Sequence, residues 1–190
     1  MGFLKKLKKR GDRATRLAKA KDAKRERRAV REKVLTAKHR ENEINAVEKG
    51  AWKDMQVVLY TALHEQNGFG GKRLSTLFAW VQNLAECVRD DYVTEEGLLT
   101  QLMVETRYGI EVTPFDPTDD RNIKRRAIDR IVLYFLWILH DKFGFGKQRL
   151  KALHKACAAI GRDLQEGKRT INGMIKRLQG IKGFWLEARD

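Results

Sequence analysis

The chain contains an internal repeat, in which residues 64–102 match residues 140–178 at a constant offset of 76 positions. Each copy has a histidine, a Gly-Phe-Gly turn and an Arg-Leu pair in the same order: His64 and His140, Gly68-Phe69-Gly70 and Gly144-Phe145-Gly146, Arg73-Leu74 and Arg149-Leu150. Apolar positions then continue to match as far as Leu102 and Leu178. A match of turn residues and apolar positions over this length indicates one supersecondary unit that occurs twice.

The spacing of apolar residues predicts an all-α fold. Leucines, valines and aromatic residues recur three and four positions apart, which is typical of amphipathic helices, and alternating strand patterns are absent. We expect two three-helix repeats packed around a central apolar helix. The repeat helices are expected over residues 51–66, 71–90 and from Thr94, and then over 147–165 and from Thr170.

Both prolines of the chain lie between the two copies, at Pro114 and Pro117. Asp116 is a suitable N-cap residue and proline suits the first position of a helix, so we expect the central helix over 117–142. Its run Ile131–Leu139 is apolar on all sides and should be buried. The expected domains are a basic helical arm (1–49), an acidic three-helix repeat (50–113) and a basic three-helix repeat (114–190).

Charge is distributed unevenly along the chain. Residues 1–40 contain 17 basic and 4 acidic residues, which gives a net charge of +13, and the whole chain carries +15. Residues 41–120 carry a net −9 and residues 121–190 a net +11. This asymmetry favours a polyanionic partner, either nucleic acid or an anionic surface. Two alternatives are that the cations are only solvated, or that the arm folds against the acidic repeat.

The Gly-Phe-Gly turns allow two interpretations. The one we favour is a helix–helix turn that buries Phe69 or Phe145. The other is a phosphate cradle at the start of the following helix, whose first turn carries Lys72 and Arg73 in the first copy and Lys147 and Arg149 in the second. Because the first repeat is acidic, we expect Arg73 to contribute less than Arg149. That arrangement is loosely similar to the helix-hairpin-helix module. We expect His64 and His140 to hydrogen-bond a carbonyl at a helix C-terminus.

Enzyme motifs are absent from the sequence. It has no phosphate-binding Gly-Lys-Ser/Thr loop, no dinucleotide fingerprint and no nucleophile elbow. Cys87 and Cys157 do not occupy equivalent repeat positions, which argues against a duplicated metal site. We therefore expect a non-enzyme with no cofactor, no metal and no stable membrane insertion, located in the cytoplasm. The sequence leaves the oligomeric state open.

The pattern Leu-His-x-x-x-Gly-Phe-Gly-x-x-Arg-Leu begins at Leu63 and again at Leu139. It resembles small uncharacterised proteins of phages and prophages of Gram-positive bacteria. The resemblance covers most of residues 57–178 and excludes the basic arm. It implies a phage or mobile-element accessory role, such as nucleic-acid handling or interference with a nucleoprotein host defence.

These observations together predict a non-catalytic nucleic-acid-binding protein, on DNA or RNA, possessing a basic arm that contacts phosphates. The alternative is a protein-interaction or virion structural component whose arm docks on an acidic protein surface. The residues expected to contact nucleic acid are Lys5, Lys8, Arg10, Arg13, Arg25, Arg27, Arg28, Arg125, Arg126, Lys147, Arg149 and Lys151.

Overall fold

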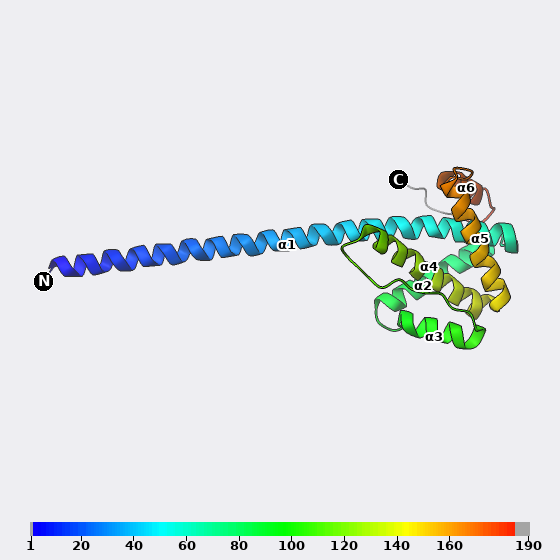
Figure 1. Cartoon of the computed structure of the whole chain (residues 1–190), viewed down its shortest axis with the longest axis horizontal. Helices are drawn as coiled ribbons and strands as arrows, with labels where there is room; N and C mark the ends of the chain where they lie inside the picture. The colour runs from blue at the N-terminus through cyan, green and yellow to red at the C-terminus, as the bar shows by residue number, and fades with distance from the viewer. Residues whose placement is uncertain (1, 185–190) are drawn as a thin grey trace. The chain divides into compact units, whose positions relative to one another are not determined.

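The computed structural model describes the backbone of residues 2–184 and the side chains of residues 25–184. This part of the chain contains six helices and no strand (Figure 1). The expected all-α class is therefore confirmed. The helices are α1 (Gly2–Asn67), α2 (Gly71–Arg89), α3 (Glu95–Thr106), α4 (Asp120–Phe143), α5 (Lys147–Gln165) and α6 (Ile171–Gln179).

Helix α1 is continuous where the sequence predicts a basic helical arm (1–49) and a separate helix over 51–66. Gly50 lies between these two expected segments, but an isolated glycine within a helix costs only about 1 kcal/mol relative to alanine. Alanine, lysine and glutamate on both sides are strong helix formers, so the helix passes through this position. The chain as a whole divides into two compact units, Met1–Asn45 and Ala46–Asp190.

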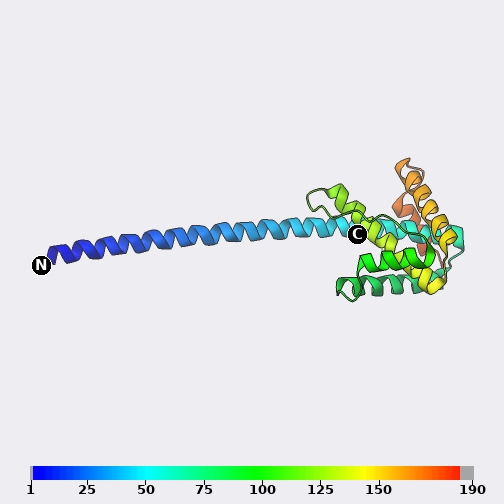
Figure 2. The same ribbon diagram turned by 60° about the horizontal axis from the view of Figure 1, so that its bottom comes forward.

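The unit Ala46–Asp190 contains one apolar core, to which helix α4 contributes the longest buried run. From Ile131 to Leu139 every residue is buried except Trp137, which is half-buried. Helix α4 packs against α2, α3 and α5 (Figure 2). Helix α1 contacts the run as well, with the ring centroids of Tyr60 and Phe135 5.2 Å apart. The expectation that this run is buried is thus correct.

Local capping signals fix the starts of α3 and α6. The hydroxyl of Thr94 accepts a hydrogen bond from the backbone N–H of Gly97 at 3.1 Å. Thr170, which lies 76 positions later, does the same with Gly173 at 3.1 Å. These are ordinary N-cap bonds that satisfy an amide left without a partner inside the helix. Both predicted starts are confirmed.

The predicted start of the helix at Pro117 is wrong, since α4 begins at Asp120. The carboxylate of Asp116 bonds instead to the N–H and the hydroxyl of Thr118, at 2.9 and 2.7 Å, and closes a local turn. Asp119 then accepts a bond from the N–H of Arg121 at 2.8 Å and caps the helix. Asp116 and Asp119 both suit the N-cap position, and Asp119, which directly precedes the helix, forms the capping bond.

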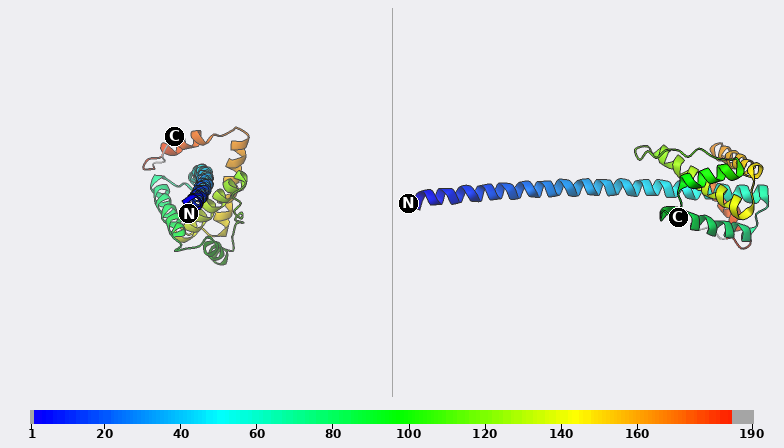
Figure 3. Two further views of the ribbon diagram at one scale, coloured as in Figure 1. Left: turned by 90° about the vertical axis from the view of Figure 1, so that its left-hand side faces the viewer. Right: turned by 90° about the horizontal axis from the view of Figure 1, so that it is seen from below.

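Helices α3 and α6 lie on opposite sides of the unit Ala46–Asp190 (Figure 3). Beyond α6 the chain returns to the core, where the ring of Phe184 is buried against Tyr60, with ring centroids 5.1 Å apart. The expectation that the C-terminal apolar residues pack on the core is correct for Phe184 and for the half-buried Ile181. Trp185 and Leu186, which belong to the same expectation, lie outside the described residues.

Candidate phosphate-binding site

The first Gly-Phe-Gly turn is a closed, hydrogen-bonded structure. Gly68 has a φ of +61°, which turns the chain out of α1 in a conformation that favours glycine. The N–H of Phe69 then bonds back to the carbonyl of Leu63 at 3.2 Å. The ring of His64 donates from Nδ1 to the carbonyl of Phe69 at 2.9 Å. The turn is therefore fixed by one backbone bond and one side-chain bond.

The second turn has the same bonds. Gly144 has a φ of +64°, and the N–H of Phe145 bonds to the carbonyl of Leu139 at 3.0 Å. The ring of His140 donates from Nδ1 to the carbonyl of Phe145 at 3.1 Å, and its Nε2 lies 2.8 Å from a carboxylate oxygen of Glu105. Each histidine does bond a carbonyl, as expected, but the carbonyl belongs to the turn phenylalanine rather than to the helix.

The two turns meet at one pocket. Phe69 and Phe145 are both buried, with 3% of each residue exposed, as the structural interpretation of the turns expects. Their rings contact edge to face, with centroids 6.1 Å apart. Next to them is an open pocket of about 280 Å³. It is lined by Asn67, Phe69, Arg73, Phe143, Phe145 and Arg149.

Two guanidinium groups line this pocket. That of Arg73 lies over the ring of Phe69, 5.7 Å from its centroid. That of Arg149 lies over the ring of Phe145 at 4.7 Å and also donates to the carbonyl of Gly144. None of the lining residues is acidic. The pocket is therefore positively charged, and aromatic faces hold both of its cations.

Asn67 adds a polar group at the end of α1. Its Oδ1 atom is buried and has no hydrogen-bond partner among the described residues. A carboxamide carries an acceptor and two donors. Asn67 lines the pocket, and a side-chain rotation that brings this group to the pocket surface would let it bond to a molecule there.

The other predicted contacts in the unit Ala46–Asp190 lie outside the pocket lining. Lys147 and Lys151 are exposed on α5. Arg125 is mostly exposed and donates to the buried carboxylate of Asp129 at 3.3 Å. Arg126 is half-buried, and its guanidinium bonds to the carbonyl of Thr113 at 3.1 Å. Of these four residues, only the two lysines have no polar partner among the described residues.

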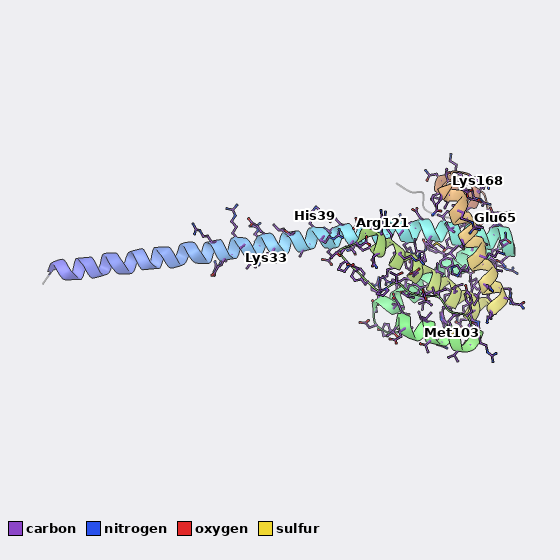
Figure 4. The ribbon with its side chains drawn as sticks, viewed as in Figure 1. Lys33, His39, Glu65, Met103, Arg121 and Lys168 are labelled. Atoms are coloured by element: carbon purple, nitrogen blue, oxygen red, sulfur yellow. The ribbon has the colours of Figure 1, made fainter. Side chains whose placement is uncertain are left out.

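The arm cations with described side chains are exposed. Arg25 and Arg27 form no ion pair with any described residue, and Arg28 pairs with Glu32 at 3.2 Å. Other side chains of this stretch, among them Lys33, extend from the helix in the same way (Figure 4). The remaining predicted contacts, Lys5, Lys8, Arg10 and Arg13, lie outside the described side chains.

The sequence predicts a contact at Arg149 and a weaker one at the equivalent Arg73, and it gives no indication of Asn67 or Phe143. The weaker expectation for Arg73 came from the net negative charge of its repeat, but none of the acidic residues of that repeat lines the pocket. No pattern along the chain indicates that the two turns share one pocket.

No protein-family model, curated protein or solved structure matches this chain. Within residues 2–184, none of the helices combines the length and the apolar character that crossing a bilayer requires.

Proposed function

We propose that the protein binds nucleic acid without catalysis, through sequence-independent contacts between its basic arm and phosphates. One observation carries this proposal: residues 25–40 contain seven basic and two acidic residues, and every one of these side chains except Arg40 is exposed. A row of exposed cations along a helix is what phosphate contacts require.

The arm also lacks a packing reason for its helical structure. Val30, Val34 and Leu35 are its largest described apolar residues before Arg40, and each is more than half exposed. Helices in proteins gain most of their stability from packing, and the like charges of this segment repel each other. A bound nucleic acid would neutralise the positive charges of the arm. The arm cations would in turn displace the counterions condensed on the phosphates, and the release of these counterions favours binding.

The proposal also covers the arrangement of the helices and the cellular role. Residues 50–113 and 114–190 would be two copies of one three-helix unit, with α4 as the central helix. The equivalent caps at Thr94 and Thr170 and the equivalent bonds of His64 and His140 support this repeat. The protein would act in the cytoplasm of a bacterial host as a phage or mobile-element accessory. Its target there would be nucleic acid or a nucleoprotein complex of the host defence.

The test compares two variants of the full chain in which the same amount of charge is removed. The first replaces Arg25, Arg27 and Arg28 by glutamine. The control replaces three exposed cations of the other unit, Arg107, Arg121 and Lys176, by glutamine. Fluorescence anisotropy with a labelled DNA duplex and with single-stranded RNA, over a series of salt concentrations, gives the affinity and its salt dependence.

The arm variant should bind at least about tenfold more weakly at moderate salt. Its slope of log affinity against log salt should fall by about one unit for each phosphate that the arm no longer neutralises. The control variant should be weakened much less, because its cations are scattered. Equal weakening of the two variants would show a general charge effect without an arm contact. Absence of binding to either nucleic acid would overturn the proposal and favour docking of the arm on an acidic protein.

A further inference from the structure

We propose that the pocket between the two Gly-Phe-Gly turns binds one phosphate group, which Arg73 and Arg149 hold together. Both turns contribute to the same site, so the phosphate would connect the two repeats. The inference rests on the proposed function only for the biological source of the phosphate, a nucleic acid. Binding of phosphate in the pocket does not require the arm.

The charge of the pocket carries the inference. The half-buried arginines of the same unit all have carboxylate partners: Arg126 and Arg130 pair with Glu95, and Arg169 pairs with Glu65 and Asp163. Arg73 and Arg149 are exposed, and neither has a carboxylate partner among the described residues. Arg73 has no hydrogen bond or ion pair there, and Arg149 bonds to the backbone carbonyl of Gly144. Two cations in one concave site without a carboxylate repel each other, and a bound anion would relieve that repulsion.

The aromatic rings set the geometry of the site. Each guanidinium lies over a phenylalanine ring, which limits its motion and leaves N–H groups available at its edge. Guanidinium groups match the oxygen geometry of phosphate through two parallel hydrogen bonds. The rings of Phe69 and Phe145 are buried and covered, so they offer no open face on which a base could stack. The third lining phenylalanine, Phe143, is half-buried. With two of the three rings covered, the two guanidinium groups, which bind phosphate, would dominate recognition.

The volume of the pocket and the carboxamide of Asn67 agree with a phosphate group as the ligand. A volume of about 280 Å³ is close to the lower end of small-molecule pockets, which span roughly 300–1,000 Å³. It is sufficient for a phosphate group with part of the adjoining sugar. The carboxamide of Asn67, whose buried Oδ1 has no partner among the described residues, would bond to a phosphate oxygen or to a sugar hydroxyl after a side-chain rotation that exposes it.

The experiment follows the side-chain Nε–H signals of Arg73 and Arg149 by NMR while the full chain is titrated. The probes are inorganic phosphate, a nucleoside monophosphate and a short single-stranded DNA without a terminal phosphate. Both signals should shift together and saturate at the same concentration of each bound probe. The DNA displaces inorganic phosphate if the source is a backbone phosphodiester. If only the monophosphate displaces it, the source is a terminal phosphate or a free nucleotide.

Substitutions then test the shared site. Arg73→Ala and Arg149→Ala should each weaken binding of inorganic phosphate by about tenfold or more. Arg149→Lys keeps the charge without the planar fork and should show an intermediate loss. Lys155→Ala removes an exposed cation of the same helix outside the pocket lining and should change affinity less than twofold. The thermal midpoint of each variant is measured in parallel.

A loss at Arg149 with none at Arg73 would overturn the shared site, as would unchanged affinity in both variants or an equal loss in the Lys155 control. If Arg149→Ala fails to fold, Arg73→Ala decides the question, since Arg73 has no polar protein partner to lose among the described residues. If the protein binds phosphate in the pocket but does not bind nucleic acid, this inference stands and the proposed function is overturned. If nucleic acid binds through the arm and phosphate does not bind in the pocket, the proposed function stands and this inference is overturned.

Discussion

Arg130 and Glu95 form an ion pair that joins α4 to the first turn of α3. The same carboxylate accepts hydrogen bonds from Arg126 at 3.4 Å and from the hydroxyl of Tyr134 at 3.1 Å. Burial is the main cause that raises the pKa of Tyr134 to about 12, so this hydroxyl stays a neutral donor. One acidic residue thus satisfies three side chains of α4.

Replacing Glu95 by alanine should lower the free energy of unfolding by about 1–3 kcal/mol. Removing one partner of a buried ion pair costs more than that, but these side chains are 17–30% exposed and solvent weakens the effect. Glu96→Ala is the matched control, because Glu96 lies in the same first turn and is exposed. Urea denaturation of both variants measures the difference. Equal losses would assign the effect to the helix dipole alone.

The core of the unit Ala46–Asp190 gives a second prediction. Leu136 on α4 is 1% exposed, and its replacement by alanine should lower the free energy of unfolding by about 2–5 kcal/mol. Its neighbour Trp137 is half-buried and provides a weaker test. Val104→Ala on α3 is the control, since that side chain is 74% exposed and should have almost no effect. A Leu136 variant with an unchanged midpoint would contradict the observed burial.

The sequence predicts local structure well in this chain because the signals are local. Thr94 and Thr170 begin helices since a threonine hydroxyl reaches an amide three residues away, and this requires no information from distant residues. The start of α4 was missed because Asp116 and Asp119 both suit a cap, and the hydroxyl of Thr118 decides between them. Competing local bonds of similar strength are difficult to rank from sequence.

The candidate site could be predicted only in part, for a different reason. Arg149 was expected to face an anion from its position at a helix start. That Arg73 lines the same pocket depends on how the two turns pack against each other, and no local pattern specifies that contact. The net negative charge of residues 41–120 did not predict the charge of the pocket, because none of the acidic residues of that segment lines it.

Glu105 gives the protein a dependence on pH. Hydrogen bonds from Gln101, first, and from His140 lower the pKa of its carboxyl below the ordinary value of 4.5. Because the pKa is lower in the folded than in the unfolded state, the resulting stability is fully present above about pH 4.5. It is lost as the pH falls through the folded-state pKa. Glu105→Gln should therefore reduce the loss of stability in acid.

Chemical denaturation at a series of pH values from about 6 to about 3 measures this effect. Glu111→Gln removes an exposed carboxylate for which the structure shows no partner among the described residues, and it should leave the acid dependence close to that of the parent protein. If both variants follow the parent curve, the bonds of Glu105 contribute nothing to stability in acid.

Two kinds of glycine in this chain should respond to alanine in opposite directions. Gly68 and Gly144 have positive φ angles, and no atom lies within 4 Å of the position of an added Cβ. Alanine at either position therefore meets no steric contact but adopts a left-handed backbone, which costs about 1–2 kcal/mol.

Gly161 lies inside α5 with equal space around it and without a positive φ. Alanine there should stabilise the protein by up to about 1 kcal/mol, because it raises helix propensity. Thermal denaturation of the three variants gives the signs directly, and a Gly144→Ala variant as stable as Gly161→Ala would show that the turn does not require its left-handed glycine.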